Sequence, residues 1–384
     1  MPDSPARSIC YLASSQVPSD AANSIHVVHM CQAMSDLGNN VTLIAPTLKI
    51  PFSNKMDILR QKYSVKADYA LHHIWIAGIP GGGWIYRRQL SRVIRRAKPD
   101  FVYGRNLEDC LFAAQSGHET VLEVHTPVWM MGGNSEGILE ALIAEPTFKA
   151  LVVISKALAE VYSKTYKSIK NKIIIAPDAA PEWQQIKRKE NTGSKFRVVY
   201  VGGLYPGKGI EILVDLAPKC LWAEIIVVGG SESEIRNWQT RIPQATKNIV
   251  FVGRQPHAKV YKYLISADVL VAPYQHHVQG FGDTPNLAPW MSPLKIFEYM
   301  AACRPMIVSD LPVIREVLEH KHNALLVDPE DVESWAHAIE HIRYNPKIAR
   351  AMADRAHSEY LKHYTWSSRT KNIFAKLETI GHLY

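Results

Sequence analysis

Residues 196–209 read FRVVYVGGLYPGKG, a run of β-branched and aromatic residues that ends in a glycine-rich turn. A short apolar strand followed by a glycine turn and an amphipathic stretch is typical of the strand–loop–helix unit of a parallel sheet. The same pattern recurs in AEIIVVGG, NIVFVGR, ADVLVAPY, MIVSD and ALLVDPED, with helical patterns between them and a helical region over 333–359. We therefore predict a doubly wound α/β domain over 196–362.

The residues before this domain repeat the pattern. Strand-like runs occur at 6–15, 39–47, 101–105, 119–126, 150–155 and 172–177, and a helix is expected from Ser24 to Leu37. Polar residues dominate from Trp183 to Lys195, where the alternation stops. We predict a first domain over 1–183, a linker over 184–195 and an amphipathic C-terminal segment over 363–384. Two such domains imply a cleft, with ligands at the carboxyl ends of the strands.

Composition and charge narrow the function classes. With 384 residues, 47% of them hydrophobic and 21% charged, the chain has the composition of a globular protein of about two domains. The net charge of +8 favours anionic partners, which include nucleic acid, lipid headgroups and phosphorylated small molecules. The five cysteines are scattered without a C-x-x-C pair, which argues against a disulfide scaffold or a zinc ribbon and favours a cytoplasmic protein. We expect no signal peptide and no transmembrane segment, so that any membrane contact is peripheral.

The glycine-rich turn GGLYPGKG, residues 202–209, is close to a nucleotide-binding P-loop. It departs from that motif because Gly209 stands where a Ser or Thr must reach magnesium, and because Pro206 has no N–H to offer a phosphate. Two interpretations remain: a plain glycine turn between strand and helix, or a loop that lets a phosphate approach the backbone beside Lys208.

The second motif is SPLKIFEYMA, residues 292–301. Pro293 fits the first turn of a helix, and the N–H groups of Leu294 and Lys295 would then be available to an anion. Glu298 lies in a helix too apolar to be fully exposed, so that its carboxylate needs partners. A ribose diol would satisfy both oxygens, and a partner on the helix surface is the alternative.

These two motifs, with VVGG, NIVFVGR, ADVLVAPY and SDLPVIREVLEHKHNALLVDPED in the same order, resemble the donor-nucleotide half of the retaining glycosyltransferases of family 4. The N-terminal half is similar to the same family through SDAANSIHVVHMCQAMSDLGNNVTLIAP, EVHTPV and LVVISKALAEVY. The resemblance implies the GT-B fold, in which two Rossmann-like, doubly wound parallel-sheet domains face a central cleft and the C-terminal helix crosses back to the first domain. It also implies transfer of a hexose from a nucleotide-diphosphate sugar to an acceptor hydroxyl, with retention of configuration and without a metal ion or other cofactor.

The resemblance assigns roles to particular positions. His125, Lys208 and Glu298 are expected to be catalytic: His125 approaches the transferred sugar, Lys208 binds the donor diphosphate and Glu298 binds the ribose. The donor-binding set as a whole is Gly202, Gly203, Lys208, Arg254, Tyr274, Ser292, Pro293, Leu294, Lys295 and Glu298. The acceptor-side set is Asn23, Ser24 and Trp129.

Two departures from the family pattern concern the donor site. Trp290 replaces the first glutamate of the family's E-x7-E motif, after the stretch QGFGDTPNLAP. Gly203 stands where many relatives carry an arginine, and Arg254 at the end of NIVFVGR is a candidate for the missing charge.

Four further features have two interpretations each. The segment 87–98 carries no acidic residue and could be a packed surface helix or a helix that adheres to anionic lipid at the inner face of the membrane, through Arg87, Arg88, Arg92, Arg95, Arg96 and Lys98. His26 and His29 lie three apart, but with no carboxylate or third histidine nearby in the sequence we expect no metal there. His276 and His277 could contact the donor or lie in a plain loop. Residues 128–137, VWMMGGNSEG, are expected to form a mobile loop at the acceptor site or a simple connection.

Three other functions stay open on the sequence. A nucleotide-sugar 2-epimerase would share the two-domain architecture, and a catalytically inactive nucleotide-sugar-binding partner subunit would explain the missing glutamate. A nucleic-acid-binding protein is disfavoured, because no reading helix or aromatic stacking motif accompanies the basic charge.

Overall fold

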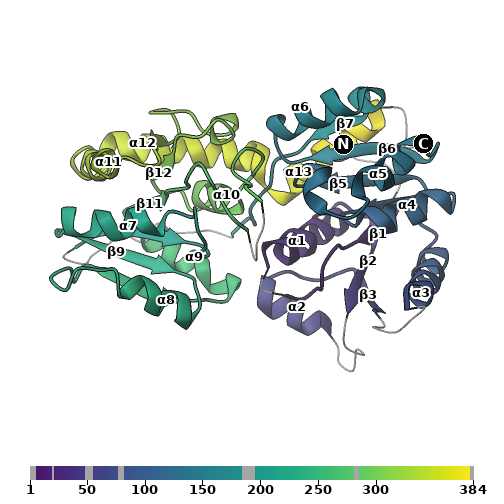
Figure 1. The fold of residues 1–384 in the computed structure, drawn as a ribbon, viewed down its shortest axis with the longest axis horizontal. Helices are drawn as coiled ribbons and strands as arrows, with labels where there is room; N and C mark the ends of the chain where they lie inside the picture. The colour runs from purple at the N-terminus through teal and green to yellow at the C-terminus, as the bar shows by residue number, and fades with distance from the viewer. Residues whose placement is uncertain are drawn as a thin grey trace. The chain divides into compact units, whose positions relative to one another are not determined.

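The structure is a computed structural model that describes residues 6–19, 21–47, 55–76, 82–183, 195–280 and 285–380. Its contacts divide the chain into two units, Met1–Pro177 together with Trp366–Tyr384, and Asp178–Thr365. Each unit contains one parallel β-sheet covered by helices (Figure 1). The predicted fold of two parallel-sheet Rossmann-like domains is confirmed.

The first unit contains a seven-stranded sheet in the order β3-β2-β1-β4-β5-β6-β7. Its strands are β1 (Ser8–Leu12), β2 (Asn40–Thr47), β3 (Ala70–Trp75), β4 (Phe101–Gly104), β5 (Thr120–Val124), β6 (Phe148–Val153) and β7 (Ile173–Ile175). The strand β3 was not among the predicted strands. It lies at the sheet edge with alternate side chains partly exposed, and its sequence ALHHIW has only a weak apolar signal.

Helices of the first unit come from both ends of the chain. They are α1 (Ala22–Asp36), α2 (Lys55–Tyr63), α3 (Gly82–Ala97), α4 (Leu107–Gln115), α5 (Ser135–Ala144), α6 (Lys156–Thr165) and α13 (Trp366–Thr379), with the 3-10 turns η1 (Val128–Met131) and η2 (Lys167–Lys172). The last helix, α13, packs against α1 (Figure 1). The first unit is therefore completed by residues that follow the second unit in the sequence.

The second unit contains a six-stranded sheet in the order β10-β9-β8-β11-β12-β13. Its strands are β8 (Phe196–Val201), β9 (Ala223–Val228), β10 (Ile249–Gly253), β11 (Val269–Ala272), β12 (Met306–Ser309) and β13 (Leu325–Val327). The strand order reverses between β8 and β11. Ligands of such sheets bind beyond the carboxyl ends of the strands at this reversal, and the glycine-rich turn follows β8 directly.

The helices of the second unit follow the predicted alternation with one difference. They are α7 (Ile210–Leu216), α8 (Glu232–Gln239), α9 (His257–Ser266), α10 (Leu294–Ala301), α11 (Val332–Tyr344) and α12 (Pro346–Glu359), with the short turns η3 (Ala217–Lys219), η4 (Ile314–Glu316) and η5 (Tyr360–Tyr364). The region predicted to be helical over 333–359 consists of two helices, because Pro346 begins α12 and cannot continue the hydrogen bonds of α11.

The boundary between the units differs from the predicted 183. Residues 178–183 belong to the second unit, where the Ala180 N–H donates to the Tyr364 carbonyl at 3.0 Å and the Tyr360 hydroxyl donates to the Pro181 carbonyl at 2.7 Å. The second unit ends at Thr365, three residues beyond the predicted 362. The predicted linker, 184–195, lies outside the described residues except for Lys195.

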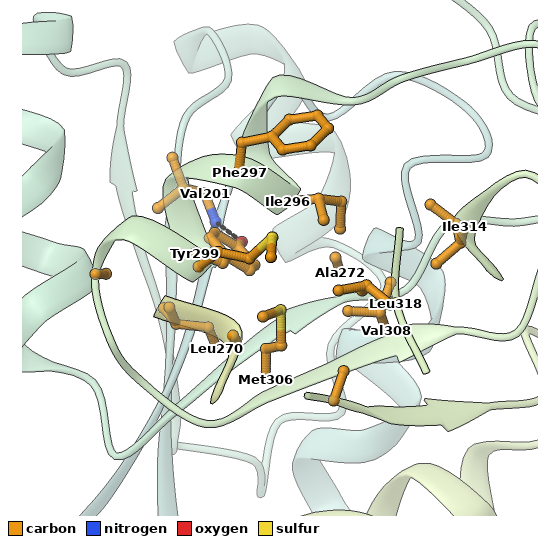
Figure 2. Packing of buried hydrophobic residues seen from close by; sticks show 14 of the residues in the cluster. Val201, Leu270, Ala272, Ile296, Phe297, Tyr299, Met306, Val308, Ile314 and Leu318 are labelled. Carbon is orange, nitrogen blue, oxygen red and sulfur yellow. Dashed lines mark hydrogen bonds between the residues drawn. The ribbon is translucent and has the colours of Figure 1, made fainter. Parts of the chain in front are cut away.

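The core of the second unit fixes α10 on the sheet. Figure 2 shows Ile296 and Tyr299 of this helix facing the side where Leu270 and Met306 of the strands lie, within one buried cluster. The buried Tyr299 hydroxyl accepts the N–H of Val201, the last residue of β8, at 3.0 Å and donates to the Val271 carbonyl of β11 at 3.1 Å. These bonds hold α10 at the strand ends where the order reverses.

Among the described residues, no helix combines the length and the apolar character needed to span a bilayer.

Candidate active site

The glycine-rich turn of the second unit is a β-turn and not a P-loop. The Lys208 N–H donates to the Tyr205 carbonyl at 3.1 Å, with Pro206 and Gly207 at the two central positions. Gly207 has a φ of +78°, so that the turn has the Pro-Gly arrangement of type II. A Cβ at Gly207 would lie 1.8 Å from the His277 carbonyl oxygen, and the Gln275 N–H donates to the Gly207 carbonyl at 3.0 Å. The turn therefore packs against the loop that follows β11.

This packing brings two lysines and two tyrosines together. The Lys295 Nζ lies 3.9 Å from the centre of the Tyr200 ring and 4.7 Å from that of Tyr274, and the Lys208 Nζ lies 5.4 Å from the Tyr274 ring. Gly202 makes room for Lys295, because a Cβ there would lie 2.7 Å from the Nζ. Within the described part of the chain, the Lys295 Nζ is buried and has no hydrogen-bond partner. A buried amine that contacts ring faces and has no hydrogen-bond partner can still donate hydrogen bonds to an anion.

Burial changes the acidity of both lysines. It lowers the pKa of Lys208 to about 8. Burial, followed by repulsion from Lys208, lowers the pKa of Lys295 well below its ordinary value, and the Glu298 carboxylate opposes that change. Two desolvated amines at one strand end are costly to protonate unless an anion approaches them.

Glu298 lies one turn beyond Lys295 on α10 and has a partner that we did not predict. The His257 Nε2 lies 2.7 Å from Glu298 Oε1, and the glutamate is 7% exposed. His257 begins α9 directly after Pro256, a position without any periodic signal in the sequence. The sequence left two partners open for Glu298, a ribose diol or a protein group. His257 is a protein group, and it accounts for one of the two carboxylate oxygens.

Three further residues predicted for the donor site, Ser292, Pro293 and Leu294, lie at the start of α10. Pro293 is the N-cap of α10, one position earlier than predicted, and the first N–H groups of any helix have no acceptor within the helix. This applies to Leu294 and Lys295. The Ser292 hydroxyl accepts the Asp178 N–H at 2.8 Å and so anchors the start of the second unit.

Arg254 is exposed at the end of β10. Its charge is close enough to Tyr205 in the glycine-rich turn to oppose the rise in pKa that burial and Glu234 cause there. The Gly203 carbonyl accepts the Tyr200 hydroxyl at 2.7 Å. Trp290 lies in the turn before α10, and His276 and His277 are exposed beside the glycine-rich turn.

In the first unit, His125 follows β5 and belongs to a buried polar cluster. Its Nε2 lies 2.7 Å from Glu123 Oε1, the His26 Nε2 lies 2.9 Å from the same oxygen, and the Arg369 Nη2 lies 2.8 Å from it. The Tyr103 hydroxyl donates to Glu123 Oε2. The sequence analysis named His125 but missed Glu123 and Arg369, although a glutamate inside the buried strand TVLEV was a signal that could have been used.

The charge of Glu123 is stabilised within this cluster. Burial by itself raises its pKa, but Arg369 and the two histidines outweigh that effect and hold the pKa well below its ordinary value. The sequence places no carboxylate or third histidine near His26, but the fold brings Glu123 and His125 beside it. Ligand atoms of His26, Glu123 and His125 lie within 4.8 Å of one another, a spacing that could hold a cation. The guanidinium of Arg369 already supplies a positive charge to the same oxygen. His29 stacks on Trp366 instead.

The three acceptor-side residues differ in their surroundings. Asn23 donates to Ser14 and Ser15 at 3.0 and 2.9 Å and accepts from Arg105. Ser24 is fully buried, with its hydroxyl 2.7 Å from that of Tyr63, which makes it a structural anchor. Trp129 is 48% exposed in η1. Of the segment 128–137, η1 covers the first four residues and α5 begins at Ser135, so that the segment connects β5 to α5 and contains short helical turns.

Comparison with known proteins agrees with this geometry. Residues 195–345 match the family model described as "Glycosyl transferases group 1". The chain is 29% identical to the O-antigen chain mannosyltransferase RfbU of Salmonella typhimurium over 53% of this chain and 55% of that protein. It is 24% identical to the phosphatidyl-myo-inositol mannosyltransferase of Mycobacterium leprae, over 93% and 92%.

The chain spans little more than half the length of the first curated relatives that it matches. Among solved structures, HepE from Anabaena in complex with UDP and glucose superposes with a TM-score of 0.71 at 14% identity, over 97% of this chain and all of that one. This likeness concerns the fold. Residues 195–345 are therefore similar to the group 1 glycosyltransferases, and the chain as a whole has the GT-B fold of its structural neighbours.

Proposed function

We propose that the protein transfers a sugar, a hexose, from a nucleotide-diphosphate donor to an acceptor hydroxyl. The observation that carries the proposal is the Lys295 Nζ, which is buried beside Lys208 and has no hydrogen-bond partner among the described residues. A diphosphate would supply the charge and the acceptor atoms that both amines need. The UDP and glucose in the HepE complex support the same class of donor.

In this proposal the second unit binds the donor. Lys208, Lys295 and the N–H groups at the start of α10 contact the diphosphate, with Arg254 nearby on β10. Glu298 accepts the ribose hydroxyls with the carboxylate oxygen that His257 does not hold, and the Tyr274 ring lies beside both lysines. The lysines then stabilise the negative charge that grows on the diphosphate as the sugar leaves, which is an electrostatic form of catalysis.

We further propose that configuration is retained by a same-face reaction, as the resemblance to family 4 implies. In the first unit, the buried carboxylate nearest His125 is that of Glu123, and its bonds to Arg369, Tyr103 and the histidines leave it unsuited to act as a nucleophile. The departing diphosphate is then the base that takes the acceptor proton. The two lysines would supply the charge that a metal ion supplies elsewhere, and activity in the presence of EDTA tests that part.

The proposal is tested by thermal shift with a panel of nucleoside diphosphates and their sugars, followed by product analysis with and without acceptors. A ligand at 100 times its Kd stabilises a protein by about 2.7 kcal/mol, well within detection. We expect a shift with at least one diphosphate and new glycoside only when acceptor is present. Turnover of donor alone would identify a 2-epimerase, and binding without turnover an inactive partner subunit. No shift with any member of the panel would overturn the proposal.

A second proposal concerns where the protein works, which we infer to be the cytoplasmic face of an anionic membrane. Five of the predicted basic residues lie within helix α3, and all of them are exposed: Arg87, Arg88, Arg92, Arg95 and Arg96. Leu90 and Ile94 of the same helix are buried. It begins at Gly82, earlier than predicted, so that Trp84 lies on the helix itself. Trp84 is 65% exposed with Arg88 beside its ring at 5.3 Å, an arrangement suited to the headgroup region of a bilayer.

A further inference from the structure

Glu123 is a charged residue in the interior of a sheet. It lies on the interior strand β5, between β4 and β6, pairs in register with Val152 of β6, and its side chain has no exposed surface. A carboxylate at such a place costs several kcal/mol unless charged groups and hydrogen bonds compensate it. The residues that compensate Glu123 therefore indicate what the carboxylate is for.

The main compensation comes from the far end of the chain. Arg369 lies on α13 and is 2% exposed. Its guanidinium donates to both Glu123 oxygens, at 2.8 and 3.4 Å, and also to the Ala176 and Pro177 carbonyls at 3.1 and 2.9 Å. An arginine with four such bonds has little freedom to turn, and it fixes the carboxylate in turn.

We propose that Glu123, held by Arg369, is a positioning residue that fixes the tautomer of His125. An ionised carboxylate can only accept hydrogen bonds, so that the His125 nitrogen 2.7 Å from it, Nε2, must carry a proton. In the neutral ring Nδ1 is then the acceptor nitrogen. The chemistry that His125 offers the donor sugar is thus decided by a glutamate two residues earlier and by the C-terminal helix. This inference rests on the proposed function only where it refers to the sugar.

The groups that face Glu123 differ in whether they carry a charge. Those facing it are Tyr103 on β4, Tyr11 on β1, His26 on α1, His125 after β5 and Arg369 on α13. Among these, Arg369 carries a charge at every physiological pH, while the tyrosines stay neutral because burial raises the pKa of both. His26 shares the Oε1 atom with His125 and contacts it edge to face, with ring centres 4.9 Å apart. Arg369 is therefore the group among these whose positive charge beside Glu123 does not depend on pH.

The test is ¹⁵N-histidine correlation spectroscopy on the full chain without substrate, which distinguishes the two tautomers directly. His125→Gln assigns the signal. We expect wild-type His125 to be protonated at Nε2 alone when neutral. Glu123→Met combined with Arg369→Met removes both charges, so that no buried charge is left alone, and His125 should then show a mixture of tautomers. Arg369→Met alone should raise the pH at which His125 becomes doubly protonated. Arg350→Met, at an exposed ion pair, is the control.

A wild-type signal from the Nδ1–H tautomer, or a single Nε2–H tautomer that persists in the double variant, would overturn the proposal. So would a shift of the His26 and His125 signals on addition of Zn²⁺ to the wild type, because the cluster would then be a metal site. Activity gives a separate readout: Glu123→Gln should lower kcat for transfer at least tenfold and leave the donor KM unchanged. If no donor is turned over, the proposed function fails while the spectra still decide this inference.

Discussion

The ammonium group of Lys295 lies 3.9 Å from the centre of the Tyr200 ring, closer than any other cation–ring pair in the described part of the chain. Tyr200 lies next to the end of β8, and Lys295 lies at the start of α10. The contact provides some stabilisation for the amine but no hydrogen bond. The burial of Lys295 without a hydrogen-bond partner therefore lowers the stability of the free protein, and an anionic ligand would remove this penalty.

Lys295→Met should make the free protein more stable and weaken donor binding at the same time. The substitution removes a buried amine with a depressed pKa, and it also removes one charge-assisted contact worth about 1.5–3 kcal/mol to a diphosphate. We expect a higher Tm without ligand and about a tenfold to hundredfold loss of nucleoside diphosphate affinity by calorimetry. Lys259→Met, at an exposed lysine on α9, should change neither. Unchanged affinity in Lys295→Met would remove this residue from the donor site.

Donor affinity should fall above about pH 8. The folded-state pKa of Lys208 is about 8 because of burial, against 10.5 when exposed, and a bound diphosphate favours the protonated form. Above pH 8 the free protein must take up a proton to bind, which costs about tenfold in affinity per pH unit. Lys208→Arg should make this dependence less steep, since arginine stays charged while Lys295 must still take up a proton. A flat affinity between pH 8 and 10 in the wild type would contradict the assignment.

The same shift has the opposite consequence for stability of the free protein. Between pH 8 and 10.5 the unfolded chain holds a proton on Lys208 that the folded protein has lost, so that the unfolding free energy contributed by this residue rises with pH. Chemical denaturation of wild type and Lys208→Met across this range measures the difference. A contribution that falls with pH would show that the lysine is paired and not desolvated.

Glu298→Ala should lower kcat/KM by a factor that corresponds to about 2–4 kcal/mol of transition-state stabilisation. The variant loses two charge-assisted hydrogen bonds of about 1.5–3 kcal/mol each, and water compensates part of that loss. A donor with 2′-deoxyribose offers a double-mutant cycle: it should be a poor substrate for the wild type, and little worse than the ribose donor for Glu298→Ala. His257→Gln should cost less than Glu298→Ala. Additive effects of deoxyribose and the substitution would place the ribose elsewhere.

Gly207→Ala should destabilise the second unit by at least about 2 kcal/mol, because a left-handed backbone conformation is unfavourable for alanine and its Cβ would meet the His277 carbonyl. Gly83→Ala is the matched control: it lies in α3, where a Cβ meets nothing within 4 Å. Thermal unfolding of both variants gives the comparison. Equal Tm values would mean that the turn can rearrange at no cost.

Removal of the arginines at 92, 95 and 96, each replaced by glutamine, should weaken binding to anionic vesicles about a hundredfold, at about 1 kcal/mol per basic residue near the surface. Binding should also fall with added salt. Replacement of Arg236 and Arg350, which are exposed on the second unit, serves as the control. Equal binding of the two variant sets would contradict a role for α3.

Much of the fold and of the donor site could be predicted because local signals carried them. Buried parallel strands give continuous apolar runs, and GGLYPGKG and SPLKIFEYMA stand directly beside such runs. The edge strand β3 has no such run and was missed, and Pro346 divided a helix at a residue that the apolar pattern did not mark. Arg369 and His257 could not be recognised as partners of site residues, since each meets its partner across the fold, whereas Glu123 stands two residues before His125 in a buried strand and could have been recognised.

From the sequence by itself we could predict two parallel-sheet domains and the order of the motifs that follow their strands. It also named Lys208, Glu298 and His125 as candidate site residues. The sheets and the two motifs need only apolar periodicity and turn chemistry, which act over a few neighbouring residues, whereas His125 was named through the resemblance to family 4. Only the tertiary structure decided that Lys295 is buried against Tyr200, that His257 holds Glu298 and that Arg369 neutralises Glu123, 246 positions away in the chain. Burial and charge compensation are properties of neighbours in space, and a parallel sheet with a returning helix brings together residues that the chain keeps far apart.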